Sequence, residues 1–420
     1  LNVLARMAAD PAANSAASRA AMAQAVTAEL ERARADPKGD PASLAGIHGA
    51  MASVFNYLQQ PDLQLQAALK ELDFLRQASA ARAEIGEAHR QIALAYARRG
   101  ELVTATQQIA QGLAEMPEPL SAEERVLVGR LHRALARYRF QLGNMEGAAV
   151  AGEASLAHFE RLPPAMLNMA ANHFGSAAAD LVGALAAQGR DTEAQRWLDR
   201  VDRIYASRAD IREADRADIE MARGRLRLGA AQPELAAEAF RAAGRLYEPQ
   251  FGSGGANAAV VDSLVIDSLS VAGRFDDART LLARWDKAGV RPLLMQAAQI
   301  HTDAEDVVAA ARALDRIESD PNFLKVSPAR GPLAGTLRGR WLVATGQLEA
   351  AVATLQKVEA DARRHLPGAL RWQLDASLVF FDALLEQQDL PGAHAVLARA
   401  CAVGARAASA VDEQRCNDAA

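Results

Sequence analysis

Apolar positions recur along the chain at helical spacing, and the apolar stretches break at single small or polar residues. In six places an alanine follows the break by five positions and opens the next apolar stretch. The six pairs are Gly100 with Ala105, Gly143 with Ala148, Gly189 with Ala194, Gly273 with Ala278, Gly346 with Ala351, and Gln388 with Ala393. Two altered copies of this step are Gly229 with Ala236 and Gln60 with Leu65. The breaks are about 42 residues apart, which indicates an internal repeat.

Glycine explains the breaks, because it accepts the left-handed conformation that ends a helix. Alanine at the start of the next helix lets two helices approach closely. Each unit is therefore predicted to be two antiparallel helices joined by a tight turn. A lone pair cannot bury its apolar faces, so we expect neighbouring pairs to stack into an all-α solenoid. No alternating run rich in Val, Ile and Thr predicts a strand.

Some segments depart from the regular spacing. The step from Gly273 to Gly346 is nearly twice the usual length, so we expect two units there with an eroded turn near Asp303. The segments Pro249–Asn257 and Asp320–Pro332 are predicted to be loops. Two local features complete the pattern: Ser121 with Glu124 predicts a capping box, and one helix is expected from Met166 to Gln188.

Composition agrees with thin helical layers. Half of the 420 residues are apolar, but only 5% are aromatic. The net charge is −5 and Arg and Glu are interspersed, which argues against a nucleic-acid surface. No run of eighteen apolar residues predicts a membrane span. The chain starts at a leucine without a leader pattern, so we expect it to be a piece of a longer protein.

The residues around the breaks resemble a known family. Leu94 and Tyr96 precede Gly100, and Phe140 and Leu142 precede Gly143, as in tetratricopeptide (TPR) repeats of the long-helix variety. The resemblance implies a right-handed superhelical solenoid of antiparallel helix pairs. It places about eight or nine pairs in residues 42–400, linker or capping helices in 1–41 and a capping segment in 401–420. It also implies that the first helix of each pair lines the concave face.

A second resemblance concerns the N-terminal region. The run Ala9, Asp10, Pro11, followed by an Ala/Leu-rich helix and by Asp36-Pro37, is similar to the region after the kinase domain in large bacterial Ser/Thr protein kinases. This likeness implies the extracytoplasmic, periplasmic sensor of a receptor kinase, with the kinase domain in the same parent chain. The alternative is a cytoplasmic TPR regulatory or scaffold domain of a transcription regulator or another signalling protein.

No catalytic motif is present. Zinc-protease, nucleophile-elbow, phosphate-loop, CxxC and kinase signatures are all missing, and the eight histidines are scattered. The glycines of 252–255 lack the strand and lysine of a phosphate loop, so an inter-helix loop is favoured there. We therefore predict no catalytic residue, no metal ligand and no cofactor, and hence not an enzyme.

Cys401 and Cys416 are the only cysteines. They fall on the last two predicted helices, and a hairpin turning near 404–410 would bring them together. In an oxidising compartment they would form a disulfide. Two unrelated thiols, with Cys401 as a small core residue, are the alternative.

Candidate binding residues are polar groups on first helices, where a peptide, protein or small ligand would lie. One set accompanies adaptable apolar side chains, and the other combines arginines that would clamp acidic groups with one aromatic ring. The candidates are Asn168, Asn172, His173, Arg130, Arg137, Arg223, Arg227, Arg338 and Trp341. The alternative is that these polar groups cap neighbouring helices and that the arginines pair with acidic residues nearby.

Overall fold

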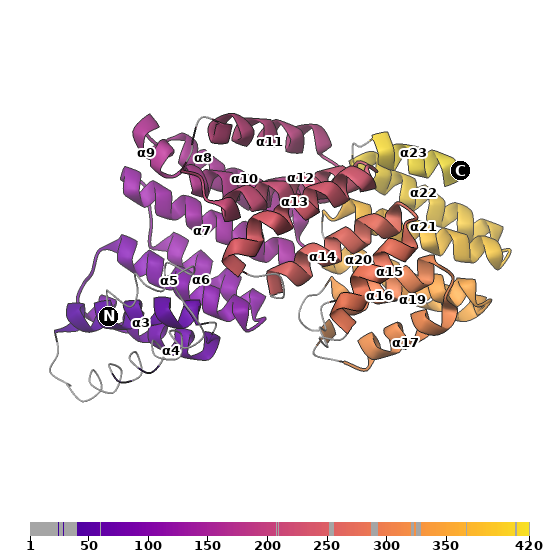
Figure 1. Ribbon diagram of the computed structural model, residues 1–420, viewed down its shortest axis with the longest axis horizontal. Helices are drawn as coiled ribbons and strands as arrows, with labels where there is room; N and C mark the ends of the chain where they lie inside the picture. The colour runs from indigo at the N-terminus through magenta and orange to yellow at the C-terminus, as the bar shows by residue number, and fades with distance from the viewer. Residues whose placement is uncertain are drawn as a thin grey trace. The chain divides into compact units, whose positions relative to one another are not determined.

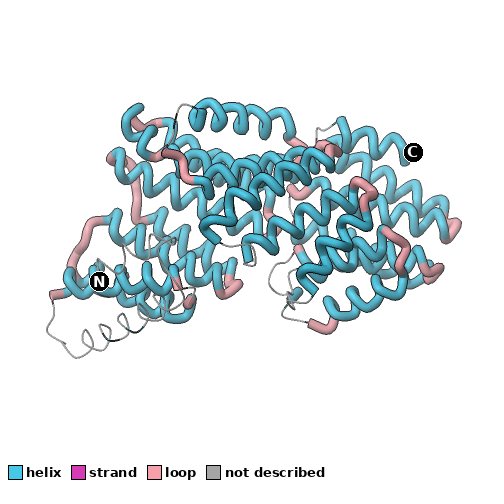
Figure 2. The backbone as a smooth tube through the Cα atoms, in the orientation of Figure 1, coloured by secondary structure: helices cyan, strands magenta, loops and turns pink. Residues whose placement is uncertain are grey.

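The computed structural model describes residues 24, 28, 40–58, 60–206, 208, 210–251, 256–286, 293–320, 323–324, 329–366, 368–407 and 410–419. Within these ranges all regular structure is helical, as Figure 2 shows, and the all-α prediction is confirmed. The run Ala9, Asp10, Pro11 and the glycine-rich segment 252–255 lie outside the described residues.

The helices follow one another as antiparallel pairs (Figure 1). The pairs are α3 (Pro41–Tyr57) with α4 (Pro61–Gln77), α5 (Arg82–Arg98) with α6 (Leu102–Ala114), α7 (Ala122–Gln141) with α8 (Met145–Glu160), α10 (Ala171–Ala187) with α11 (Asp191–Ala206), α12 (Glu213–Gly229) with α13 (Pro233–Phe251), α14 (Ala256–Val271) with α15 (Phe275–Asp286), α16 (Leu294–Asp303) with α17 (Val307–Glu318), α19 (Arg330–Ala344) with α20 (Leu348–His365), and α21 (Leu370–Glu386) with α22 (Leu390–Ala407). The short α9 (Pro164–Met169) precedes α10, and α23 (Ala410–Ala419) follows the last pair.

Most turns inside the predicted pairs contain a residue in the left-handed conformation, whereas Gln60, the break of the altered copy before Leu65, has a φ of −106°. All five predicted glycines and Gln388 have positive φ, between 63° and 81°. The altered copy at Gly229 is corrected, because the left-handed residue is Ala231, which stands five positions before Ala236. The eroded turn near Asp303 is also present, with Glu305 at a φ of 58°.

The alanine five positions after the left-handed residue is buried in every such turn. The fully or almost fully buried alanines are Ala105, Ala148, Ala194, Ala236, Ala278, Ala310, Ala351 and Ala393. A methyl group at this position fills the narrow space between the two helices, where a larger side chain would push them apart.

Two compact units divide the chain. The first comprises Leu1–Tyr138 and Glu153–Ala170, and the second comprises Arg139–Gly152 and Ala171–Ala420. The composition of the sequence shows no boundary of this kind. The core of the first unit includes Met51, Phe55 and Ile92, and successive cores of the second are built around residues such as Phe240 and Phe380.

Several local predictions need correction. The expected helix from Met166 to Gln188 is two helices, since the backbone leaves helical geometry at Ala170. Pro249 lies inside α13 rather than in a loop.

The predicted capping box is present: the Ser121 amide donates to Glu124 Oε2 at 2.7 Å, and the Glu124 amide donates to Ser121 Oγ at 3.2 Å.

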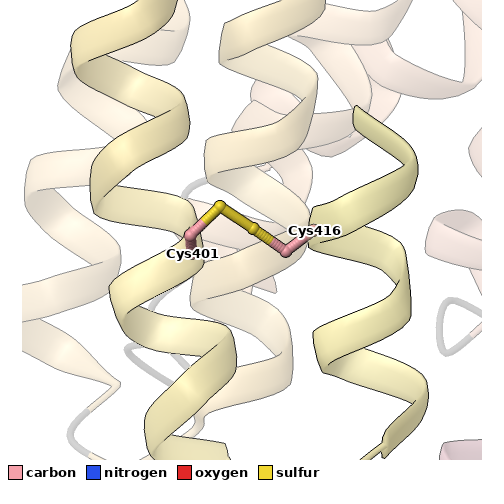
Figure 3. The surroundings of a disulfide bond; sticks show 2 residues. All are labelled: Cys401 and Cys416. Carbon is pink, nitrogen blue, oxygen red and sulfur yellow. A yellow bond between two sulfur atoms is a disulfide. The ribbon is translucent and has the colours of Figure 1, made fainter. Parts of the chain in front are cut away.

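A disulfide closes the C-terminal end of the second unit. Cys401 on α22 and Cys416 on α23 are bonded, with their Cα atoms 5.4 Å apart (Figure 3). This separation is within the usual range for disulfides. The bonded pair is the one that the sequence suggested. The predicted boundary at 400/401 falls within α22.

Candidate functional site

The first helices of four successive pairs surround a cleft in the second unit. Its volume is about 780 Å³, within the usual range for ligand sites. These first helices contact one another in order: α14 contacts α16, α16 contacts α19, and α19 contacts α21 (Figure 1). The lining residues are Asp267 and Val271 of α14, Met295, Gln296 and Gln299 of α16, Phe323, Arg330, Leu333, Thr336, Leu337 and Arg340 of and before α19, and Trp372, Asp375, Leu378, Val379 and Asp382 of α21.

Aromatic and aliphatic side chains make up much of the wall. Trp372, Leu378 and Val379 are partly exposed there. All three lie on α21, which also has many buried residues. The guanidinium of Arg330 lies 4.3 Å from the centre of the Phe323 ring and donates to the Phe323 carbonyl at 2.9 Å. Cation–π contact and the hydrogen bond together fix this side of the cleft.

Carboxylates give the cleft its polar character. Asp267 is half-buried and accepts a long hydrogen bond of 3.4 Å from Gln296 Nε2. Burial, with a smaller contribution from nearby Asp303, raises the pKa of Asp267 to about 7. Burial also raises the pKa of Asp382, although Arg340 opposes the shift and Glu386 adds to it.

Asp303 and Arg340 form the main ion pair beside the cleft. Arg340 Nη2 lies 2.5 Å from Asp303 Oδ1, and Ser270 Oγ donates to Asp303 Oδ2 at 2.6 Å. Asp303 Oδ1 thus lies in an ion pair with Arg340, and Oδ2 accepts the hydrogen bond from Ser270. These contacts join α14, α16 and α19.

The predicted residues Arg338 and Trp341 lie elsewhere. Arg338 donates to Asp315 at 2.7 Å and to Glu318 at 2.8 Å, and it also stacks over Trp341. Trp341 Nε1 donates to the Val307 carbonyl at 2.8 Å. Both side chains therefore fasten α19 to α17, which matches the alternative considered from the sequence.

Arg223 and Arg227 of α12 also engage neighbouring helices. Arg223 pairs with Asp202 of α11 at 3.0 Å and with Glu220 of its own helix at 3.3 Å. Arg227 donates to the Leu235 carbonyl at 3.2 Å. The structure does not place either side chain in the cleft.

In the first unit, Arg130 lies 3.5 Å from Glu87, and burial together with Arg90 and Arg133 lowers its pKa. Arg137 is exposed on the same helix. Asn168, on α9, is exposed as well.

The remaining candidates, Asn172 and His173, are half-buried in the first turn of α10 in the second unit. Asn172 Oδ1 is buried without a hydrogen-bond partner among the described residues. Neither residue lines the cleft.

Sequence reasoning missed Asp267, Asp382 and Trp372. A signal was available for all three, because they lie on first helices of predicted pairs. Asp267 also directly follows the apolar run Leu264–Ile266 of its helix. The scattered arginines attracted attention instead, since their pairing with acids on neighbouring helices depends on three-dimensional packing.

Within the described ranges, no helix is long and apolar enough to cross a membrane. No group of three or more His, Cys, Asp or Glu side chains in these ranges is placed to hold a metal ion.

Comparison with known proteins gives the fold. No protein-family model matches the chain, and no curated protein sequence matches it significantly. A solved Rap protein, complexed with competence and sporulation factor, is similar with a TM-score of 0.50 and 12% identity; the match covers 89% of this chain and 93% of that one. Yeast Tom70 has a TM-score of 0.39, 13% identity and coverages of 91% and 89%. The chain is a TPR-like helical repeat protein in fold.

Proposed function

We propose that the chain is a non-catalytic TPR-type sensor domain that binds an extended peptide or a segment of a partner protein in the cleft. The observation that carries the proposal is the construction of the cleft. First helices from four successive pairs line it, and they combine exposed aromatic and aliphatic surface with a few polar groups. The similar Rap protein, which was solved with a bound factor, is an example of such a fold with a ligand.

The size of the cleft favours a chain segment. A volume of about 780 Å³ accommodates several amino-acid residues. Gln299 also lines the wall, and its amide can hydrogen-bond to a peptide backbone. Leu378 and Val379 offer apolar contacts to its side chains.

A random library of 12-residue peptides displayed on phage tests the proposal. Peptides selected on the wild-type protein are then measured by fluorescence anisotropy against two leucine variants of α21. Leu378→Gln places a polar group in the cleft and should weaken binding about tenfold. Leu385→Gln changes an exposed leucine of the same helix outside the cleft and should leave binding unchanged. Failure to select any peptide, or equal binding by both variants, would reject the proposal.

We further propose that the domain is the extracytoplasmic sensor of a bacterial Ser/Thr receptor kinase. The support is the resemblance of the N-terminal run and the Cys401–Cys416 disulfide, a bond that is typical of oxidising compartments. Alkylation of intact cells with a membrane-impermeant thiol reagent, after mild reduction outside the cells, tests the location. Labelling of Cys401 and Cys416 supports the periplasm, whereas labelling only after lysis supports the cytoplasmic regulatory alternative.

A further inference from the structure

The basic side chains of the cleft have stronger interaction partners than two of its carboxylates, those of Asp267 and Asp382. Its guanidinium groups already have partners: Arg340 pairs with Asp303, and Arg330 stacks on Phe323 and binds the Phe323 carbonyl. Asp267 has a single hydrogen bond to the residues that the structure describes, the long one from Gln296. Among the described residues, neither Asp267 nor Asp382 forms an ion pair with a basic side chain. The cleft therefore offers acceptors for positive charge and few donors for negative charge.

Both carboxylates are in surroundings that disfavour their charged form. Burial raises the pKa of Asp267 and of Asp382. A cation beside either group would stabilise its ionised form. A ligand carboxylate would instead meet like charges. The amide of Gln296 also favours a ligand that donates hydrogen bonds. Its Nε2 donates to Asp267, and its Oε1, which can only accept, is buried without a partner in the described part of the chain.

We propose that the cleft recognises a basic peptide segment, whose lysine or arginine side chains are held by Asp267 and by Asp382. This inference rests on the proposed function and specifies the ligand chemistry of the same site. The neighbouring Trp372, Leu378 and Val379 suit the aliphatic stem of a long basic side chain or an adjacent apolar residue. Because these apolar side chains line the same cleft as the acidic groups, they favour a peptide over an isolated amine or a metal ion.

Two fluorescein-labelled pools of 10-residue peptides provide the probe. Both pools have the same randomised positions, and they differ only in carrying four lysines or four glutamates at fixed places. We expect the lysine pool to bind the full chain at least tenfold more tightly than the glutamate pool. Asp267→Asn and Asp382→Asn should each weaken lysine-pool binding about three- to tenfold. Asp276→Asn, which changes a fully exposed carboxylate on the second helix α15, should leave it unchanged.

Charge reversal gives an independent check. Asp382→Lys should reduce the preference for the lysine pool, while circular dichroism verifies that the helices remain folded. Equal or tighter binding of the glutamate pool, with sensitivity to Leu378→Gln, would overturn the inference and leave the proposed function in place. Spermidine competing as strongly as the lysine pool would overturn the peptide assignment. Equally strong competition by Ca²⁺ would also overturn the peptide assignment. Binding of neither pool, together with an empty phage selection, would reject the proposed function itself.

Discussion

Arg371 and Asp191 are separated by 180 positions in the chain and form a charge-assisted hydrogen-bonded pair inside the second unit. The two guanidinium nitrogens of Arg371 lie 3.2 and 2.8 Å from the two carboxylate oxygens of Asp191. Arg371 Nη1 also donates to the Ala186 carbonyl at 2.6 Å. The side chain of Arg371 is only 9% exposed. The start of α21 is thereby fixed to the turn between α10 and α11.

Removal of the acidic partner should therefore destabilise the second unit. Asp191→Ala leaves the buried Arg371 without its carboxylate, and we expect a loss of about 2 kcal/mol or more in the free energy of unfolding. Urea denaturation followed by circular dichroism measures it. Asp277→Ala removes a half-exposed pair with Arg274 and should cost less than about 0.5 kcal/mol. Equal losses in the two variants would show that the long-range pair contributes no special stability.

Two glycines of the repeat turns should differ in their tolerance of alanine. Gly143 and Gly346 both have positive φ, at 81° and 71°. A Cβ atom on Gly143 would collide with Leu366 and lie 3.0 Å from the His365 carbonyl, whereas Gly346 faces open space.

Gly346→Ala should therefore cost about 1 kcal/mol from backbone strain alone. Gly143→Ala should cost about 2–4 kcal/mol, because the steric conflict is added. Thermal unfolding of the two variants gives the comparison. A Gly143→Ala protein as stable as Gly346→Ala would contradict the close contact between the Gly143 turn and Leu366.

Much of the fold follows from local sequence signals. The glycine turns and the buried alanine five positions later were predictable, since both depend on backbone geometry within one helix pair. The turn at Glu305 was placed correctly near Asp303 although it has no glycine. The contact of Arg371 with Asp191 was not predictable, because it depends on how distant pairs pack.

Glu71 of the first unit should make stability depend on pH. Burial raises its pKa to about 7, with further contributions from Glu87 and Glu84. The folded state holds the proton more tightly than the unfolded state. This contribution to stability is therefore complete below about pH 4.5 and is lost as the pH rises through about 7.

Glu71→Gln should accordingly raise the unfolding free energy at pH 8, by about 1–3 kcal/mol, and have little effect at pH 4.5. Glu349→Gln, at an exposed glutamate of α20, is the control and should have no pH-dependent effect. Unfolding curves at the two pH values decide the matter. The same stability change at both would mean that folding does not shift the pKa of Glu71.

The disulfide should stabilise the attachment of α23. Closure of a loop with a sequence separation of 15 contributes about 3 kcal/mol in the chain-entropy estimate. Cys416→Ser should therefore speed amide hydrogen exchange in α23 while the exchange of α3 and α4 stays the same. Without reductant, thiol titration should find no free thiol in the wild-type protein. Two free thiols would show that the bond does not form.

The candidate site was only partly predictable. The repeat predicts that the site lies on first helices. The residues selected from the sequence, however, are not the ones that line the cleft. Arg223 and Arg338 are of the residue type expected in an anion clamp. In the structure, however, each guanidinium pairs with a carboxylate on a neighbouring helix. Asp267 acquires its unusual pKa from burial beside Asp303, and no local sequence pattern reveals that proximity.

Lysine-pool binding should strengthen as the pH rises from 6 to 8. Asp267 has a pKa of about 7, so it is mostly protonated at the lower pH and mostly ionised at the higher one. The other groups around it are Gln296 and Asp303 of α16, with Arg340 of α19 paired to Asp303. Anisotropy titrations should show this rise in wild type and a smaller one in Asp267→Asn. An equal pH dependence in both would assign the effect to another group.

Hydrogen–deuterium exchange with and without a phage-selected peptide tests the central claim most directly, because it reports where on the chain the ligand binds. Binding in the cleft predicts slower exchange in α14, α16, α19 and α21, with the second helices α15, α17 and α20 little changed. Protection confined to those second helices, or to the first unit, would contradict the assignment of the cleft as the binding site.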